Sequence, residues 1–197
     1  MPPFGDQDDF DICPTGNEMV FSARDHSPSV AWETKRNIFS VAMTVVKDQA
    51  NSCHVISMGN PTRISHSQGQ ESHPVYSPDG QSVAFLSMKR PGYESDKNRI
   101  MIYSKATRET KELAADWSLS PHSIAWSTDS SQLFLTAPSH GRNSIFSLPI
   151  NEITNIPTPI IAEVNNINRS CSRVVTLSGS RLLFSTSSFT SPSEVCM

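Results

Sequence analysis

The chain has 197 residues, with 16 Lys and Arg against 19 Asp and Glu, which gives a formal net charge of −3 and a sequence pI near 6.0. This balance argues against an electrostatic nucleic-acid binder, which usually carries a basic face. No stretch approaches the roughly 18 consecutive apolar residues of a membrane-spanning helix. Apolar residues recur in short clusters instead, so we expect a folded, β-rich chain with a modest core.

One pattern recurs four times along the chain: a short apolar approach, a tight turn and then an apolar run. The four copies span residues 10–23, 74–87, 123–137 and 172–187, and their turns end at Gly16, Gly80, Ser130 and Gly179. These turn positions are 64, 50 and 49 residues apart. Such intervals are typical of the blades of a β-propeller.

The second copy shows most clearly why each repeat should form a turn followed by a strand. Its SPDG segment places Pro78 where a fixed φ favours the turn, and Gly80 where a left-handed backbone is tolerated. The following run, VAFLS, is rich in β-branched and aromatic residues and is short enough for a buried strand. The sequence therefore predicts two strands joined by a turn in every repeat.

Further strands are expected beyond each repeat, and the segments between repeats are expected to be loops. Apolar runs at 37–43, 98–104 and 143–150 each predict a second strand, and residues 109–114 predict a third. Residues 61–74 and 150–161 are polar or contain proline, as loops between blades should. Helical periodicity is nearly absent.

The predicted fold is all-β: a partial β-propeller of about four blades, of the TolB or WD40-like type. One domain, residues 1–197, would hold blade repeats near 10–50, 74–115, 123–160 and 172–197. A β-sandwich with evenly spaced strands is the alternative.

The second and third repeats resemble a known family. The stretch from 72 to 149 contains GYESDKNRI, DWSLSPHSIAWS and HGR, and it is similar to the propeller of dipeptidyl-peptidase V. That family consists of secreted fungal serine peptidases of the prolyl oligopeptidase group. The resemblance covers residues 4 to 194 and implies a propeller that caps an α/β-hydrolase domain in a complete protein. Such a protein would release N-terminal dipeptides by acyl transfer to a serine and hydrolysis by water.

The chain departs from this family in the catalytic part. None of its eight glycines frames a serine in the GxSxG pattern of the hydrolase elbow, and no βαβ alternation is present. We therefore expect an internal propeller fragment without the Ser-Asp-His hydrolase domain, inactive as a peptidase by itself. It would contribute substrate gating, anchoring and interdomain contact. The alternative is a stand-alone propeller scaffold that binds a protein partner on one face.

The resemblance implies that acidic propeller residues hold the N-terminal ammonium of a peptide substrate, since a partly desolvated ammonium needs a carboxylate partner. Glu94 and Asp96 are the candidates, and Arg99 is available to hold a substrate carbonyl or to pair with them. The alternative is that these residues, with Lys97, form a solvated or intrablade salt-bridge cluster.

Other conspicuous residues are predicted to be structural. Trp117 and Trp126 should fill the wedge between blades, and Asp116 should bond to a neighbouring turn. His140, with Gly141, should make a tight turn before the next strand. The four cysteines, Cys13, Cys53, Cys171 and Cys196, leave the disulfide state open. No metal or nucleotide motif is present, so no cofactor is predicted.

The two ends of the chain carry expectations of their own. The acidic start, MPPFGDQDDFD, lacks a secretory signal, so the chain should stay cytoplasmic if this start is authentic, although the family is typically secreted.

Asn168 opens a glycosylation sequon. The chain stops at 195–197, where another strand would be expected to continue. A partial ring exposes blade faces and strand edges, which predicts marginal solubility or a partner that completes the ring.

Overall fold

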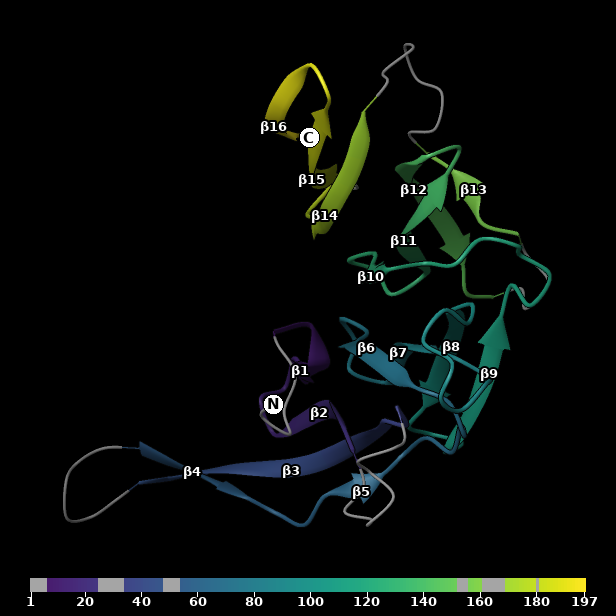
Figure 1. Cartoon of the computed structure of the whole chain (residues 1–197). Helices are drawn as coiled ribbons and strands as arrows, with labels where there is room; N and C mark the ends of the chain where they lie inside the picture. The colour runs from purple at the N-terminus through teal and green to yellow at the C-terminus, as the bar shows by residue number, and fades with distance from the viewer. Residues whose placement is uncertain (1–6, 25–33, 48–53, 152–155, 161–168, 180) are drawn as a thin grey trace.

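The structure is a computed structural model that describes residues 7–24, 34–47, 54–151, 156–160, 169–179 and 181–197 (Figure 1). Within these residues the strands form four antiparallel sheets, and the one helical element is a short 3-10 turn, η1 (Gln7–Asp9). The sheets follow one another in chain order around an open arc. This arrangement confirms the predicted all-β partial propeller. No helix among the described residues is long and apolar enough to cross a membrane.

Each sheet is built from strands that are consecutive in the chain. The first contains β1 (Phe10–Ile12), β2 (Glu18–Ala23), β3 (Asn37–Lys47), β4 (His54–Met58) and β5 (Thr62–Arg63). The second contains β6 (Glu71–Tyr76), β7 (Ser82–Ser87), β8 (Arg99–Ser104) and β9 (Glu109–Leu113). The third contains β10 (Ser123–Trp126), β11 (Gln132–Ser139), β12 (Arg142–Pro149) and β13 (Thr158–Pro159). The fourth contains β14 (Ser170–Leu177), β15 (Arg181–Ser188) and β16 (Ser191–Cys196).

We call these sheets blades one to four. The first strand of each blade, β1, β6, β10 or β14, lies on the inner side of the arc, and the later strands lie progressively outward (Figure 1). The inner strands therefore face a common centre, as the innermost strands of a propeller do.

The four predicted turn positions all adopt the left-handed backbone that the sequence chemistry required. Their φ angles are 72° at Gly16, 68° at Gly80, 59° at Ser130 and 74° at Gly179. In the first three blades the amide of this residue donates to a carbonyl three residues earlier, at 2.7 to 3.0 Å. The repeated turns therefore have one geometry, and Ser130 adopts it without being glycine.

Two apolar clusters lie between successive blades. The larger joins blades two and three and contains Leu86, Ile100, Trp126, Leu133 and Leu135, all nearly inaccessible to solvent. The smaller joins blades one and two around a core of Cys13, Val20, Ile38, Tyr76, Val83 and Phe85. Burial between blades therefore holds the arc together, as expected when each repeat covers the apolar face of its neighbour.

Two segments expected to be loops contain strands. Within 61–74, β5 pairs with the middle of β3, and β6 begins at Glu71; within 150–161, β13 pairs with β12. The two-residue strands β5 and β13 are held by backbone pairing, and their side chains are exposed or half-buried. No apolar alternation marks such strands, so the sequence pattern missed them.

Candidate functional site

A cavity of about 540 Å³ lies on the inner side of the arc, where the first strands of all four blades come together. We call it the inner cavity. Its lining includes the charged or titratable residues Asp8, Asp11, His73, His122 and Arg173. Its apolar lining includes Phe10, Val75, Ile124 and Val175. Because every blade contributes to it, the inner cavity occupies the position of the central channel of a propeller.

Two of the lining residues stand on irregularities of the inner strands. β6 is bulged between residues 72 and 75, and β14 is bulged between residues 172 and 175. His73 and Arg173 lie at the same place in the two bulges, and each has a φ of 54°. A left-handed backbone costs a non-glycine residue about 1 kcal/mol or more, and bulges often re-aim side chains beside functional sites.

Asp11, an acidic residue of the inner cavity, is held in place by backbone hydrogen bonds. The carboxylate of Asp11 accepts hydrogen bonds from the backbone amides of Tyr76, at 2.8 Å, and Ile12, at 2.9 Å. Burial raises the pKa of Asp11, and the two backbone hydrogen bonds oppose that rise. Since Tyr76 belongs to β6, this carboxylate joins blade one to blade two.

The inner cavity is also lined by hydrogen-bond donors with few partners. A ring nitrogen of His73 lies 3.1 Å from the hydroxyl of Ser72. His122 and Arg173 are exposed, and within the described residues the Arg173 guanidinium has neither an ion pair nor a hydrogen bond. Imidazole and guanidinium N–H groups at the mouth of a channel can hold the carbonyl or carboxylate oxygens of a passing peptide.

The sequence-predicted substrate residues lie elsewhere: Glu94 and Asp96 are on the loop between β7 and β8, and Arg99 is the first residue of β8. Asp96 accepts hydrogen bonds from the backbone amides of Lys89 and Arg90, both at 2.8 Å, and of Lys97, at 3.0 Å. The hydrogen bond from Arg90, foremost among these, lowers the pKa of Asp96. Asp96 therefore stabilises the shape of its own loop.

The other two predicted residues also stand outside the inner cavity. Arg99 forms an ion pair with Glu112 on β9, with Nη1 3.3 Å from Oε2. Glu94 is exposed and has no ion pair or hydrogen bond within the described residues. This ion pair lies within blade two, but Glu112 is not one of the residues of the expected salt-bridge cluster, which are Glu94, Asp96, Lys97 and Arg99. A role for Glu94, Asp96 and Arg99 in substrate binding stays a prediction.

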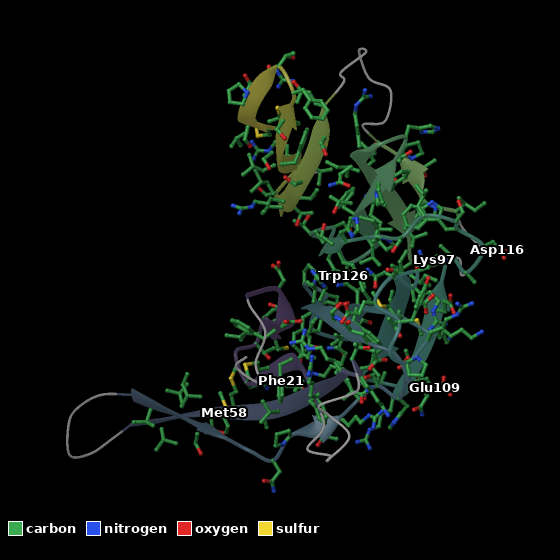
Figure 2. The ribbon with its side chains drawn as sticks, in the orientation of Figure 1. Phe21, Met58, Lys97, Glu109, Asp116 and Trp126 are labelled. Carbon is green, nitrogen blue, oxygen red and sulfur yellow. The ribbon has the colours of Figure 1, made fainter. Side chains whose placement is uncertain are left out.

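The same loop also connects blade two to the segment that enters blade three. The Nζ atom of Lys97 donates to the carbonyl of Trp117 at 2.6 Å, and the Asn98 side chain donates to the carbonyl of Pro121 at 2.9 Å. Figure 2 shows Lys97 and Asp116 on the outer side of the arc, with Trp126 nearer the inner strands.

The structural roles predicted for the tryptophans and for His140 are confirmed. Trp126 donates from Nε1 to the Val75 carbonyl at 3.1 Å, across the interface between blades two and three. Trp117 packs edge-on against Phe146, with their ring centroids 5.2 Å apart. His140 and Gly141, with φ of 50° and 79°, form the tight turn between β11 and β12. The bond expected from Asp116 is not among those that the described residues form.

Other expectations concern metals, cysteines and glycosylation. Within the described residues no group of three or more His, Cys, Asp or Glu side chains could hold a metal ion. Cys13, Cys171 and Cys196 are free thiols, and Cys53 lies outside the described residues. The sequon residue Asn168 also lies outside them.

Sequence reasoning missed His73, His122 and Arg173. Each stands six to eight residues before its repeat's turn position, at Gly80, Ser130 or Gly179. Their similar place before the turn is a signal that could have found them, because corresponding segments of propeller repeats face the same centre.

Comparison with solved structures defines the class of fold. A TolB candidate from Agrobacterium tumefaciens matches with a TM-score of 0.65 at 14% identity, over 95% of this chain and 59% of that one. The tricorn protease matches with a TM-score of 0.55 at 12% identity, over 94% of this chain and 22% of that one. At such identities the likeness establishes the propeller fold alone.

In sequence, the chain resembles part of dipeptidyl-peptidase 5. It is 35% identical to that protein from Arthroderma otae over 150 residues, which is 75% of this chain. It is 32% identical to that from Aspergillus fumigatus over 151 residues, and 29% identical to an Aspergillus niger relative over 189 residues, or 96% of this chain. The chain spans only 20 to 25% of the length of these relatives. No family model matches the chain.

Proposed function

We propose that this chain is part of the propeller of a serine-type dipeptidyl peptidase and lines the path by which peptide substrates reach the active site. The similarity to dipeptidyl-peptidase 5 over at least three quarters of the chain carries this proposal. The chemistry of dipeptide release would lie in the hydrolase domain, and this chain would contribute selection and orientation of the substrate.

Selection by size would come from the inner cavity. Its volume of about 540 Å³ suits an extended peptide segment and is too small for a folded protein. Arg173 and His122 are exposed there and can hold carbonyl or carboxylate oxygens of the peptide. Anchoring of the N-terminal ammonium would take place outside the inner cavity and would fall chiefly to Glu94, because the Asp96 carboxylate already accepts three backbone hydrogen bonds.

The test is the intact mass and reactivity of the native protein, captured from its own cells with an antibody to residues 92–100. We expect a mass far above 21.7 kDa, covalent labelling by a fluorophosphonate and release of N-terminal dipeptides from a chromogenic substrate. A native mass of 21.7 kDa without labelling would contradict the proposal.

One observation favours the second candidate, an interaction scaffold. The hairpin of β3 and β4 extends away from the rest of blade one (Figure 1), and its Val45, Ile56 and Met58 are 55 to 60% exposed. A two-stranded hairpin with exposed apolar side chains is marginal in water and suits a covering partner. Peptide affinity that is lost in Glu94→Gln would favour the peptidase. A stable heteromeric complex without peptide affinity would favour the scaffold.

A further inference from the structure

A second cleft, of about 600 Å³, lies between blades one and two and shares no lining residue with the inner cavity. Blade one and the segment that follows it contribute Glu18, Arg63 and His66 to the walls. Blade two contributes Tyr76, Tyr103, Lys105 and Arg108. The cleft therefore combines charged groups and aromatic rings from two separate sheets.

The charge of this cleft is opposite to that of the whole chain. Three cationic side chains line it against one carboxylate, although the chain carries a net charge of −3. That carboxylate, on Glu18, is already engaged in an ion pair with Lys105. The guanidinium groups of Arg63 and Arg108 are therefore left with no carboxylate on the cleft wall to neutralise them.

The two guanidinium groups also have donors to spare. Arg63 uses Nε to donate to the Ser65 carbonyl at 2.6 Å, and its terminal nitrogens make no hydrogen bond within the described residues. Arg108 is exposed on the turn after β8, and its side chain has no ion pair or hydrogen bond there. A guanidinium group presents a planar set of donors that matches the oxygens of a carboxylate or phosphate.

A buried hydroxyl without a partner lies on the wall of the same cleft. Tyr76 is 4% exposed, and its hydroxyl has no hydrogen-bond partner among the described residues. Burial and, after it, the charge of Glu18 raise the pKa of this phenol, and a side-chain interaction with Glu18 adds to the rise. The Glu18 carboxylate therefore lies close to the hydroxyl, although the two do not meet hydrogen-bond geometry. The Nζ atom of Lys105 lies 5.6 Å from the centre of the ring. An unpaired buried hydroxyl is costly, and Lys105 already engages the neighbouring Glu18 carboxylate, so an acceptor that enters from outside would satisfy the Tyr76 hydroxyl.

We infer that this cleft binds the oxyanion of a small ligand, a phosphate or a carboxylate, which accepts hydrogen bonds from Arg63, Arg108 and Tyr76. The cleft has the volume of a small-molecule site and exceeds that of a single anion, so the rest of the ligand packs against the rings of Tyr76 and Tyr103. Because the donors come from two blades, the bound ligand links them. This inference does not rest on the proposed peptidase function.

Calorimetric titration of the full chain at constant ionic strength tests it, with inorganic phosphate in one arm and succinate in the other. We expect saturable binding in at least one arm, and the tighter arm identifies the source of the oxyanion. Arg108→Gln and Tyr76→Phe should each weaken that binding about tenfold, the size of one charge-assisted hydrogen bond. Lys111→Gln is the matched control, because it removes an exposed cation of the same blade outside the cleft.

Melting of the unliganded variants separates a ligand site from a purely structural one. Tyr76→Phe should melt no lower than the unmodified chain, because it removes a hydroxyl without a protein partner. A lower melting temperature for Tyr76→Phe would overturn the inference, as would the absence of saturable binding in both arms. An equal loss of binding in Lys111→Gln would also overturn it, because the attraction would then be nonspecific.

Discussion

Two of the three interfaces between neighbouring blades are built differently, although both arise from the same repeat. Between blades two and three the contact is an apolar cluster that includes Leu86, Leu133 and Leu135. Between blades one and two, a smaller apolar cluster adjoins a buried carboxylate on Glu71, which is 2% exposed. The comparison shows that all repeats share the same strands and turns, whereas the side chains at the interfaces between blades differ from one interface to the next.

Polar groups complete the contact between blades one and two. The Glu71 carboxylate accepts a hydrogen bond from Nδ2 of Asn37 at 3.0 Å and another from the hydroxyl of Ser65. The hydroxyl of Ser22 donates to the Glu71 carbonyl at 2.6 Å. A buried polar network of this kind is stable only while its members stay paired.

One pair of equivalent residues summarises the difference. Tyr76 and Trp126 each end the inner strand of their blade, directly before the turn. Trp126 donates across the apolar interface to the Val75 carbonyl, whereas the Tyr76 hydroxyl has no partner among the described residues. The Trp126 side chain is therefore satisfied at the apolar interface between blades two and three. The interface between blades one and two contains a cleft whose Tyr76 hydroxyl has no hydrogen-bond partner among the described residues.

The largest expected effect tests the apolar interface. Leu135→Ala removes a fully buried side chain and should lower the free energy of unfolding by about 4 kcal/mol, because it leaves a cavity. Leu183→Ala on β15, where the leucine is only half-buried, is the matched control and should lower it by about 1 kcal/mol. Urea denaturation followed by tryptophan fluorescence measures both. Equal losses would show that blade four is packed as tightly as blade three.

The next effect tests the polar interface. Glu71→Ala leaves the Asn37 amide and the Ser65 hydroxyl without their acceptor and should lower the free energy of unfolding by about 3 kcal/mol. Glu112→Ala removes a carboxylate whose ion pair with Arg99 is partly solvated, so it should cost less than about 1 kcal/mol. The same denaturation experiment compares them. A Glu71 effect no larger than the Glu112 effect would mean that the network adds nothing to the interface.

A smaller effect separates the backbone strain of the turn from the steric contact between blades one and two. Gly80→Ala and Gly16→Ala introduce a side chain at the same left-handed position, which should cost about 1 kcal/mol in each case. At Gly80 the new Cβ would also lie 3.2 Å from the Cys13 sulfur of the neighbouring blade, whereas at Gly16 nothing lies within 4 Å. We therefore expect the melting temperature to fall further in Gly80→Ala. An equal fall in melting temperature would show that the close approach of residue 80 to the Cys13 sulfur adds no steric cost.

The smallest effect concerns the turn of blade three, which contacts blade two through the Asp79 amide and the Ser130 hydroxyl. Hydrogen bonds from the side chains of Ser127 and Ser131 lower the pKa of Asp129 to about 2. Because the folded value lies below the unfolded one, this stabilisation is present above about pH 4 and is lost as the pH falls towards 2.

Asp129→Asn should therefore flatten the loss of stability between pH 4 and pH 2 in acid unfolding followed by fluorescence. Asp116→Asn, at an exposed aspartate without hydrogen bonds among the described residues, should leave the profile unchanged. An unchanged profile in Asp129→Asn would contradict the expectation.

The sequence predicted the repeats well because their turns depend on local chemistry. Gly16, Gly80 and Gly179 adopt the left-handed backbone expected of them, and the strand after Gly80 is buried as its apolar run indicated. The two-residue strands escaped detection because they are held by backbone pairing, which leaves no trace in the side-chain pattern.

The candidate sites were harder to predict because they are assembled from several blades. His73 and Arg173 meet at the inner cavity from positions 100 residues apart, and the cleft beside Tyr76 joins residues from two sheets. A local motif such as GYESDKNRI draws attention to charges that are close in sequence. Two of its charges, Asp96 and Arg99, have partners within blade two.

The bulges of β6 and β14 have a consequence for how such repeats can diverge. Beyond the bulge, Val75 and Tyr76 pair with Ala84 and Val83, just as residues 125–126 pair with 134 and 133 in the unbulged blade three. One residue is therefore gained or lost at the channel wall while the register of the turn and core stays the same. Insertions and deletions at this point can change which side chains line the channel without altering the strand pairing of the rest of the blade.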